Sequence, residues 1–479
     1  MSKLSALATM LLIAASPLAQ AQTVTNLKNP APDGAGIAFV LTDGAVLAQG
    51  GGLSDWYKLT PDNTGSYVNG TWSQVASLPS NYQPDAFASA VLADGRVVIA
   101  GGEYNFGQFT LTNICAFYDP IANTWTEFPA PTGWSYIGDS PSSVLANGHY
   151  LIGDKINQLV ADLDPATMTW TQPKATGKAD FNAEEGWTLL PNESVLTYDV
   201  KDAPNSEIYD PARQAWMSAG STVVDLHSPP AVKRIKYGNG QVYHPPGEVG
   251  PGILRPDGSV FATGGTPPGG SFGHTAIYTP PAGGSGVGTW AAGPNFPTGE
   301  DAGDSFAALL PTGNVLVEAE SGRLYEFNGV TLKSTGHNGG GLLLVLPSGE
   351  VLLGGNAVYR AAGSVNPAWA PTITMAPSKL AHGHTYKIAG TQFNGLSQAN
   401  AFGDEFQTNT NYPLVRITNI ASGHVIYART HGHSSMGVAT GKATITTNFD
   451  VPATAERGAS TLVVVANGIA SASVSVTLR

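Results

Sequence analysis

The sequence predicts an all-β protein, and three observations support this fold class. Only 12% of the residues are charged, whereas 58 glycines and 34 prolines favour many short strands joined by turns. No stretch after the N-terminal segment shows a sustained helical period of apolar residues. The third observation is a set of turn and aromatic motifs that recurs in the same order along most of the chain.

The first 21 residues have the features of a secretory signal peptide. Lys3 precedes an apolar segment from Leu4 to Ala15, and Ala19-Gln20-Ala21 is a small-x-small cleavage signal. The apolar segment is shorter than the ~20 residues that a membrane-spanning helix requires. We therefore expect a secreted or periplasmic protein that is not inserted in a membrane, with residues 1–21 removed.

Charge and cysteine content exclude several classes of partner. The formal net charge is -12 and no run of Lys and Arg is present, so neither nucleic acid nor an anionic membrane is expected to bind. Cys115 is the only cysteine, which rules out an intramolecular disulfide. Because it lies in the apolar sequence ICAFY, we expect it to be a buried strand residue rather than a reactive thiol.

One repeating unit is clearest between Asp85 and Pro131. Asp94-Gly95 separates two apolar runs and predicts a two-residue hairpin turn, because glycine adopts positive φ without strain. The second half of the unit predicts two more strands, so the unit is a four-stranded antiparallel meander. Equivalent turns occur seven times, at Asp43-Gly44, Asp94-Gly95, Asn147-Gly148, Asn192-Glu193, Asp257-Gly258, Thr312-Gly313 and Ser348-Gly349.

Tryptophans mark the last strand of most units. A tyrosine or leucine followed two residues later by proline precedes each of them, as in Tyr118-Asp119-Pro120 before Trp125. An aromatic residue at a fixed place in every unit is typical of packing between neighbouring sheets. The tryptophans expected to have this role are Trp72, Trp125, Trp170, Trp216 and Trp290.

This order of Asp-Gly turn, Gly-Gly, Tyr-Asp-Pro and Trp resembles the kelch repeat, which implies a four-stranded propeller blade. Seven units imply a seven-bladed kelch-type β-propeller over residues 31–362, in which ring closure removes exposed strand edges. From 369 to 479 the pattern changes to short strands such as Leu414–Ile417 and Thr461–Val465, which predict an immunoglobulin-like β-sandwich.

A propeller followed by such a sandwich resembles the galactose oxidase family. The resemblance implies a copper ion held by two tyrosines and two histidines, with one tyrosine cross-linked to a cysteine. The positions that match the family's ligands carry Ala86 and Val249, Cys115 lies in a third strand, and Tyr243-His244 stands thirteen residues before its turn. The tyrosine–cysteine copper site is therefore expected to be missing, which disfavours a copper-radical alcohol oxidase.

Acidic residues occupy the start of the innermost strands instead. They stand eight or nine residues before their turns, so in a propeller they would converge on one mouth of the central channel. Such carboxylates could bind a hard cation, hold a polyhydroxyl ligand or keep one carboxyl protonated as a general acid. The alternative is that they cap strand ends and contact only water. The residues are Asp85, Asp139, Glu184, Glu248 and Asp304, with Glu185 adjacent to the third.

Two histidines could join this acidic ring. The segment containing His431 and His433 matches the place where the galactose oxidase family sends a histidine from its C-terminal domain toward the propeller. Residues separated by one position lie on the same side of an extended strand and could share a metal. Imidazole with carboxylates would suit zinc, manganese or iron, whereas carboxylates alone would suit calcium.

The sequence therefore favours a secreted propeller that acts on carbohydrate or another hydroxyl-rich ligand, with acid–base chemistry from Glu184, Glu185, Glu248 or Asp304. A divalent metal would be held by Asp85, Asp139, Glu248, Asp304, His431 and His433. Two alternatives stay open: a non-catalytic extracellular propeller that binds glycan or protein, and a copper oxidase with altered ligands. Reaction type, metal identity and oligomeric state are not readable from the sequence.

Overall fold

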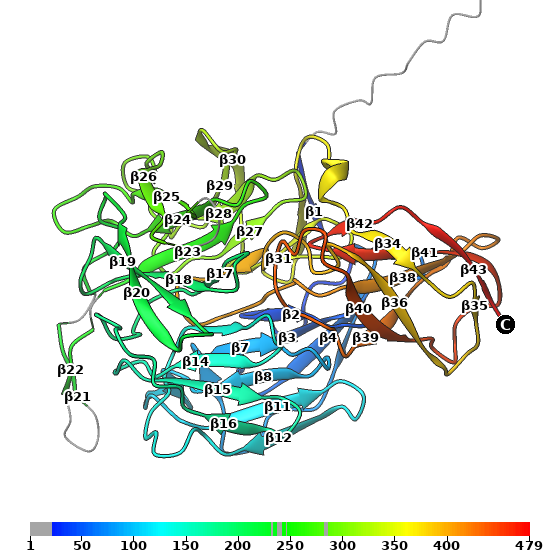
Figure 1. The fold of residues 1–479 in the computed structure, drawn as a ribbon, viewed down its shortest axis with the longest axis horizontal. Helices are drawn as coiled ribbons and strands as arrows, with labels where there is room; N and C mark the ends of the chain where they lie inside the picture. Colours follow the sequence, from blue (N-terminus) through cyan, green and yellow to red (C-terminus); the bar gives the residue numbers. More distant parts are fainter. Residues whose placement is uncertain (1–21, 231–232, 237–241, 246, 282–285) are drawn as a thin grey trace, which may run out of the picture.

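The computed structural model describes residues 22–479 except 231–232, 237–241, 246 and 282–285 (Figure 1). The expected signal peptide, residues 1–21, lies outside the described residues. The described part is an all-β architecture with many four-stranded antiparallel sheets, as β-propeller blades have. Residues Pro367–Trp369 form a short helical turn, η1. Among the described residues, no helix has the length and apolar character to cross a membrane.

Seven sheets, numbered here in chain order, repeat the same antiparallel meander. Sheet 1 contains β2 (Ala38–Val40), β3 (Val46–Gln49), β4 (Trp56–Thr60) and β5 (Thr71–Gln74), and sheet 2 contains β7 (Ala88–Val91), β8 (Val97–Ala100), β11 (Cys115–Asp119) and β12 (Thr124–Phe128). Sheet 3 contains β13 (Ser142–Val144), β14 (Tyr150–Gly153), β15 (Val160–Asp164) and β16 (Thr169–Thr171). Sheet 4 contains β17 (Thr188–Leu189), β18 (Val195–Tyr198), β19 (Asn205–Asp210) and β20 (Ala215–Ser221).

Sheets 5 to 7 complete the series, and the last one recruits the N-terminal strand β1, which pairs with β33 from Thr23 opposite Arg360 to Asn26 opposite Ala357. Sheet 5 contains β23 (Val249–Leu254), β24 (Val260–Gly264), β25 (Thr275–Thr279) and β26 (Thr289–Ala292). Sheet 6 contains β27 (Ala307–Leu309), β28 (Val315–Glu318), β29 (Arg323–Phe327), β30 (Leu332–Asn338) and β37 (Asn400–Ala401). Sheet 7 contains β31 (Leu343–Val345), β32 (Val351–Leu353), β33 (Ala357–Arg360) and β1 (Thr23–Asn26).

Two smaller sheets lie in the loops between the main ones. One contains β6 (Pro84–Asp85), β9 (Tyr104–Asn105) and β10 (Gln108–Phe109), and the other contains β21 (Ile235–Lys236) and β22 (Val242–Tyr243). Six of the seven successive pairs of first strands lie in extensive contact: β2 with β7, β7 with β13, β17 with β23, β23 with β27, β27 with β31, and β31 with β2. These strands are buried throughout, as expected for the inner strands of a propeller.

Every predicted turn lies between the first and second strands of a sheet, but its length differs from the prediction. In sheet 2, the Leu92 amide donates to the Arg96 carbonyl, and the Gly95 amide donates back to the Leu92 carbonyl. The loop therefore has three residues and ends with glycine at φ 88°. The Asp94 carboxylate accepts a hydrogen bond from the Arg96 amide at 3.0 Å, which explains why Asp or Asn precedes the glycine.

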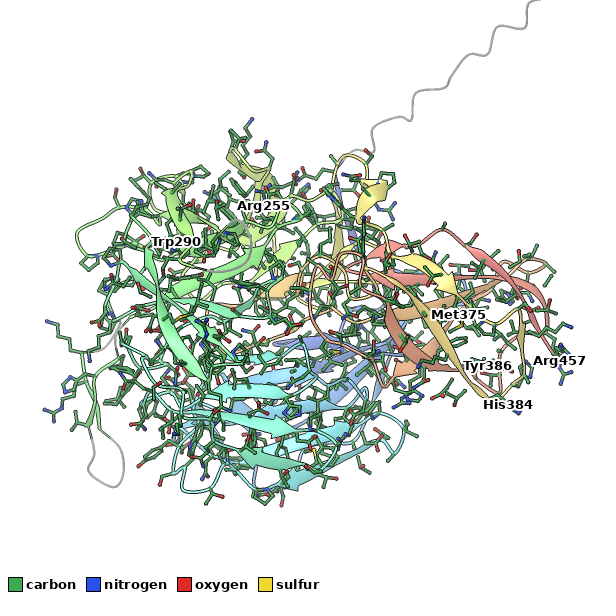
Figure 2. All side chains as sticks on the ribbon, in the orientation of Figure 1. Arg255, Trp290, Met375, His384, Tyr386 and Arg457 are labelled. Atoms are coloured by element: carbon green, nitrogen blue, oxygen red, sulfur yellow. The ribbon has the colours of Figure 1, made fainter. Side chains whose placement is uncertain are left out.

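The tryptophans join each sheet to the one before it. Trp125 in β12 donates from its indole to the carbonyl of Ala76 beyond β5, and Trp170 in β16 donates to Pro129 beyond β12. Trp290 in β26, labelled in Figure 2, donates to the carbonyl of Ala219 in β20 at 3.1 Å. The sequence-based expectation that these residues pack between sheets is confirmed for these three.

The C-terminal residues form a nine-stranded sheet beside the main sheets (Figure 1). Its two halves enclose one apolar core that includes Ile388, Val415, Phe449 and Leu462. The strands are β34 (Thr372–Met375), β35 (Lys379–Leu380), β36 (Thr385–Thr391), β38 (Leu414–Asn419), β39 (Val425–His431), β40 (Ile445–Asp450), β41 (Gly458–Ala466), β42 (Ile469–Ala470) and β43 (Val474–Leu478).

A segment between β36 and β38, residues 398–412, leaves this sheet and lies against the first strands of the main sheets. We call it the insert. Its strand β37 pairs with β27, and its polar groups bond to several other sheets, so that nearly all of it is buried. The bonds join Ser89 to Gln407, Ser143 and Leu189 to Gln398, Leu309 to Ala399, Val345 to Asn400, and Val40 to Tyr412.

Candidate functional site

Seven carboxyl groups gather around one buried lysine, and the insert contributes two of them. Before the first strands of sheets 3 to 6 stand Asp139, Glu184, Glu248 and Asp304. The groups interact electrostatically with one another and with Lys155. We call this set the Lys155 cluster: Lys155, Glu103, Asp139, Glu184, Glu248, Asp304, Asp404 and Glu405.

The backbone before the first strands aims these acids. Glu184 and Asp304 both have positive φ, 60° and 45°, a conformation that non-glycine residues seldom adopt. The Asp304 amide donates to the Val249 carbonyl at 3.3 Å, which ties the start of sheet 6 to sheet 5. Ala86 has φ 50° at the corresponding place in sheet 2. Strained residues of this kind concentrate at functional sites.

Lys155 neutralises one side of the cluster. Its ammonium group is fully buried, donates to Asp139 and lies 2.6 Å from Glu184 Oε1 and 3.9 Å from Glu103 Oε1. Burial alone would lower the pKa of Lys155, but Asp139 and Glu184 outweigh burial and raise it well above its usual value. Lys155 is therefore a charged ammonium that holds two carboxylates together.

The insert supplies the other side. Asp404 and Glu405 are 1% and 6% exposed, and burial raises the pKa values of both carboxyl groups. The charge of Glu405 adds to this effect on Asp404, and the charges of Asp304 and Asp139 add to it on Glu405. Ligand oxygens of Asp404, Asp304 and Glu405 lie within 4.8 Å of one another, and Asp404 has the same relation to Asp139 and Glu184. Within the described residues, neither Asp404 oxygen has a hydrogen-bond partner, nor has Asp139 Oδ1.

Glu248 and Asp304, near sheets 5 and 6, are accessible to solvent, and Glu103 is also partly exposed. Glu248 is half-buried, and burial followed by the charges of Glu184 and Asp304 strongly raises its pKa, so its carboxyl stays protonated at neutral pH. Asp304 reaches solvent on one side, yet the protein around its other sides desolvates the carboxyl enough to raise its pKa to about 7. A ligand from solution would meet these two groups first.

Aromatic side chains stand next to the cluster. Lys155 Nζ lies 5.8 Å from the ring centroid of Tyr243 in β22. Tyr243 stacks on Phe109 at 6.5 Å, and Phe109 meets Tyr104 edge-on at 5.9 Å. Asp85, predicted as a fifth carboxylate of the ring, is exposed in β6. Burial raises the pKa of the nearby Glu103, and the charge of Asp85 adds a smaller contribution.

Glu185 is not part of the Lys155 cluster. Its side chain is fully buried on the other side of the backbone and bonds to Lys178 Nζ at 2.8 Å and Thr197 Oγ1 at 3.1 Å. Lys178 also contacts Glu207 at 2.5 Å, and Asp199 completes the group. We call Lys178, Glu185, Asp199 and Glu207 the Lys178 cluster. The structure therefore places Glu185, a predicted acid–base residue, away from Glu184, Glu248 and Asp304.

The two predicted histidine ligands face the C-terminal sheet. His431 Nε2 lies 3.1 Å from Asp450 Oδ1, and His433 Nδ1 lies 2.9 Å from Thr447 Oγ1. Burial lowers the pKa of His433 to about 3, so its ring is neutral. In the part of the chain that the structure describes, no group of potential metal ligands contains a histidine. Acidic residues of the insert stand where the sequence interpretation placed these imidazoles.

The residues do not fit the copper site of galactose oxidases. Cys115 is fully buried in β11, where burial raises the pKa of its thiol, and its Sγ faces the Asn113 carbonyl. Val249 begins β23 at one position that matches a family ligand. His244 Nδ1 lies 3.0 Å from the Lys233 carbonyl. No copper chemistry is derived for this chain.

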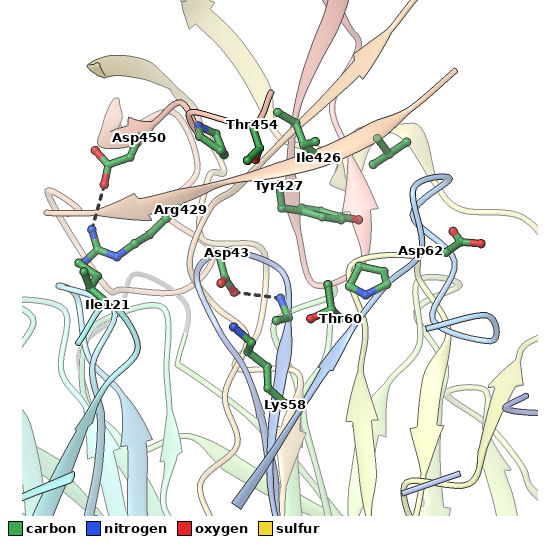
Figure 3. A pocket seen from close by; sticks show the side chains of 14 residues that line it. Asp43, Lys58, Thr60, Asp62, Ile121, Ile426, Tyr427, Arg429, Asp450 and Thr454 are labelled. Atoms are coloured by element: carbon green, nitrogen blue, oxygen red, sulfur yellow. Dashed lines mark hydrogen bonds and ion pairs between the residues drawn. The ribbon is translucent and has the colours of Figure 1, made fainter. Parts of the chain in front are cut away.

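A separate cavity lies between sheet 1 and the C-terminal sheet (Figure 3). Its volume is about 510 Å³, and Arg429 bonds there to Asp450 at 3.1 Å and to the Asp94 carbonyl at 2.7 Å. Asp43, which Figure 3 shows on the opposite wall, accepts a hydrogen bond from the Ala45 amide. Arg429 thus joins the C-terminal sheet to the turn of sheet 2, whereas the Asp43 hydrogen bond stays within the turn of sheet 1.

No family model and no curated protein matches the chain. Among solved structures, a fungal alcohol oxidase of the AA5 family in complex with copper aligns over 95% of this chain and 98% of its own, with 14% identity and a TM-score of 0.49. Virginiamycin B lyase from Staphylococcus aureus aligns over 72% and 99%, with 10% identity and a TM-score of 0.43. YjhT aligns over 64% and 98%, with 15% identity and a TM-score of 0.40.

Proposed function

We propose that the seven sheets are the blades of one kelch-type ring, residues 31–362, and that residues 369–479 form an immunoglobulin-like module, an arrangement similar to that of galactose oxidases. The recurring three-residue turns and the contacts between successive first strands support this reading. The insert then fills the channel, and the Lys155 cluster lies at its mouth.

The protein is a secreted carbohydrate-active propeller whose site is the Lys155 cluster. One observation carries this proposal: Glu248 and Asp304 are open to solvent, and the buried carboxylates behind them have no competing ligand among the described residues apart from Lys155. Carboxyl groups suit the hydroxyls of a sugar as hydrogen-bond partners. The half-buried Tyr104 and Phe109 offer apolar faces beside them.

Glu248 is the proton donor in this proposal. Its raised pKa keeps a proton on the carboxyl, which can transfer to the leaving oxygen of a glycosidic bond. The ionised carboxylates around it would stabilise the positive charge that develops on the sugar ring. Glu184 is held by Lys155 and acts through this field, without direct contact with the sugar.

The test compares purified full-length variants on a panel of soluble glycans. We expect Glu248→Gln to lower turnover by about 10²–10⁴-fold, the usual contribution of a general acid, with ligand binding retained. Glu127→Gln, an exposed glutamate in β12, is the matched control and should be unaffected. Unchanged turnover in both Glu248→Gln and Asp304→Asn would refute the proposed site.

Two other outcomes identify the alternatives. Glycan capture with no product, weakened by Asp304→Asn, would show a binding module, which the aromatic residues next to the cluster also suit. Stoichiometric copper in the purified protein, together with oxygen consumption, would instead show an oxidase with altered ligands. Elemental analysis of the protein as purified distinguishes these cases before any substrate is known.

A further inference from the structure

We propose that Asp304, Asp404 and Glu405 bind a calcium ion that joins the insert to the start of sheet 6 and presents open coordination positions to a hydroxyl-bearing ligand. The site combines one carboxylate from the loop before β27 with two from the C-terminal residues. Calcium binding itself stands on the geometry of these three side chains. The ligand contact rests on the proposed function.

The spacing of the three carboxylates suits calcium. Their ligand oxygens lie within 4.8 Å of one another. Calcium binds oxygen at roughly 2.3–2.6 Å, so oxygens on opposite sides of one ion are separated by about the same distance. Magnesium requires a tighter octahedron, and the absence of histidine and cysteine from this group of described residues disfavours zinc and copper.

The state of Asp404 is the independent observation that points to a ligand. Asp404 is 1% exposed, and both of its oxygens lack a hydrogen-bond donor in the described residues. A buried carboxylate without a donor is costly, and native structures normally satisfy such groups with a partner, water or an ion. Its near neighbours are themselves carboxyl groups, and the contact that Asp404 shares with Glu405 brings no cation or amide donor to the Asp404 oxygens.

Lys155 does not fill this role. Its ion pairs go to Asp139, Glu184 and Glu103, whereas Asp304 and the two insert carboxylates form no ion pair among the described residues. The lysine thus neutralises the half of the cluster near sheets 3 and 4. The half near sheets 5 and 6 has no such cation among the described residues, so a divalent cation bound there would compensate its carboxylates.

The backbone holds both sides of the site in place. Gly403 lies so close to sheet 5 that a Cβ added to it would be 2.7 Å from the Val249 carbonyl oxygen, the same oxygen that accepts from the Asp304 amide. Ala399, at the other end of this stretch, accepts from the Leu309 amide at 2.6 Å. Asp304 and Asp404 therefore lie in loops next to β27 and β37 that these backbone contacts hold together, as a preorganised metal site requires.

Calcium alone is the probe in the first experiment. Full-length protein stripped with EDTA is titrated with calcium chloride by calorimetry. We expect one ion per chain, and an increase in Kd of at least about 100-fold in Asp404→Asn, because losing even an outer-sphere partner of a metal costs about 10–100-fold. If Asp404→Asn does not fold, Asp304→Asn provides the test instead, because the Asp304 side chain reaches solvent. Glu127→Gln is the control.

Absence of calcium binding by the unmodified protein, or unchanged affinity in both Asp404→Asn and Asp304→Asn, would overturn the calcium site. A second arm measures glycan capture with calcium and with EDTA. Capture that persists in EDTA refutes the calcium-mediated contact and leaves the proposed function intact. Calcium binding that depends on Asp404, without recognition of any glycan, supports the ion site and counts against the proposed function.

Discussion

The Lys155 cluster and the Lys178 cluster both place a buried lysine among carboxyl groups, but they differ in size and in access to solvent. In each, a buried lysine bridges two carboxylates, and a further buried carboxylate, Asp404 or Asp199, has no hydrogen-bond partner in the described residues. The first cluster also contains Asp304 and Glu248, which solvent reaches, whereas every member of the second is buried.

This difference arises from two neighbours in the sequence. Glu184 and Glu185 precede β17, and the positive φ of Glu184 sends the two side chains to opposite sides of the backbone. The Glu184 carboxylate belongs to the Lys155 cluster, which a ligand could reach. The Glu185 carboxylate lies in the buried interior of sheet 4, in the Lys178 cluster. Identical chemistry thus serves two purposes, and exposure rather than residue type identifies the candidate site.

The largest expected effect comes from removing each lysine. Lys178→Met leaves uncompensated carboxylates in a closed interior and should lower the free energy of unfolding by about 3–5 kcal/mol. Lys155→Met should have a similar effect in EDTA but recover part of the loss in calcium, because the first cluster admits ions. Urea unfolding with and without calcium measures both, with the exposed Lys28→Met as control. If calcium restored the stability of Lys178→Met and Lys155→Met equally, or of neither variant, the proposed difference in ion access between the two clusters would be wrong.

A smaller effect is expected where the insert meets sheet 4. A Cβ on Gly186 would lie 2.1 Å from the carbonyl oxygen of Gly403, so Gly186→Ala should destabilise the protein by about 1–3 kcal/mol and weaken calcium binding by shifting Asp404. Gly36, where an added Cβ meets nothing within 4 Å, is the matched position. If Gly186→Ala and Gly36→Ala unfold at the same denaturant concentration, the insert is not held as tightly as the structure indicates.

The pH dependence of stability should report on the closed cluster. Burial raises the pKa of Asp199 to about 7. Below about pH 4 both folded and unfolded chains hold this proton. As pH rises toward 7 the unfolded chain releases it first, so the stability contributed by the protonated carboxyl is lost. Asp199→Asn should reduce this loss and stabilise the protein by about 1 kcal/mol at pH 8, a magnitude typical of one buried unsatisfied group.

Urea midpoints at pH 5 and pH 8 give the comparison. A variant with the same midpoint difference as the unmodified protein would show that Asp199 does not control this pH dependence. Calcium should leave the result unchanged, because every member of the Lys178 cluster is buried.

The smallest effect is expected at Asp85, where the sequence predicted a member of the acidic ring. Its side chain is exposed and accepts a hydrogen bond from the Ala86 amide. Asp85→Asn should change stability by no more than about 0.5 kcal/mol, as for other surface positions. It should also leave calcium affinity unchanged in calorimetry. A marked loss of affinity would extend the ion site to sheet 2.

Local chemistry made much of the fold predictable. Each Asp-Gly or Asn-Gly motif lies at a turn because its side chain caps the amide two residues on and its glycine takes positive φ, as at Asp94 and Gly95. Even Asn192-Glu193, which lacks the glycine, forms the same turn with Glu193 at φ 69°. The prediction of two-residue loops was wrong, because periodicity does not fix where a strand pair ends.

The candidate site was less predictable because it depends on contacts between distant segments. Spacing before the turns found Asp139, Glu184, Glu248 and Asp304, but it could not show on which side of the backbone Glu185 lies. Lys155 was missed because lysine is seldom buried without a partner that only the folded chain brings near. The insert carried one usable signal, an Asp-Glu pair inside a polar run rich in Asn, Gln and Thr that is too uncharged for an ordinary loop.

The insert also has a consequence for the order of events as the chain folds. Both ends of the insert connect to the C-terminal sheet, at β36 and β38, so the insert extends from that sheet to the first strands and back as one loop. Strand β1 is synthesised before the other strands, and it stays unpaired until its partner β33 has been synthesised. Neither end of the molecule can reach its final place until nearly all the chain exists. We therefore expect C-terminal truncation to leave a chain that is trapped before closure.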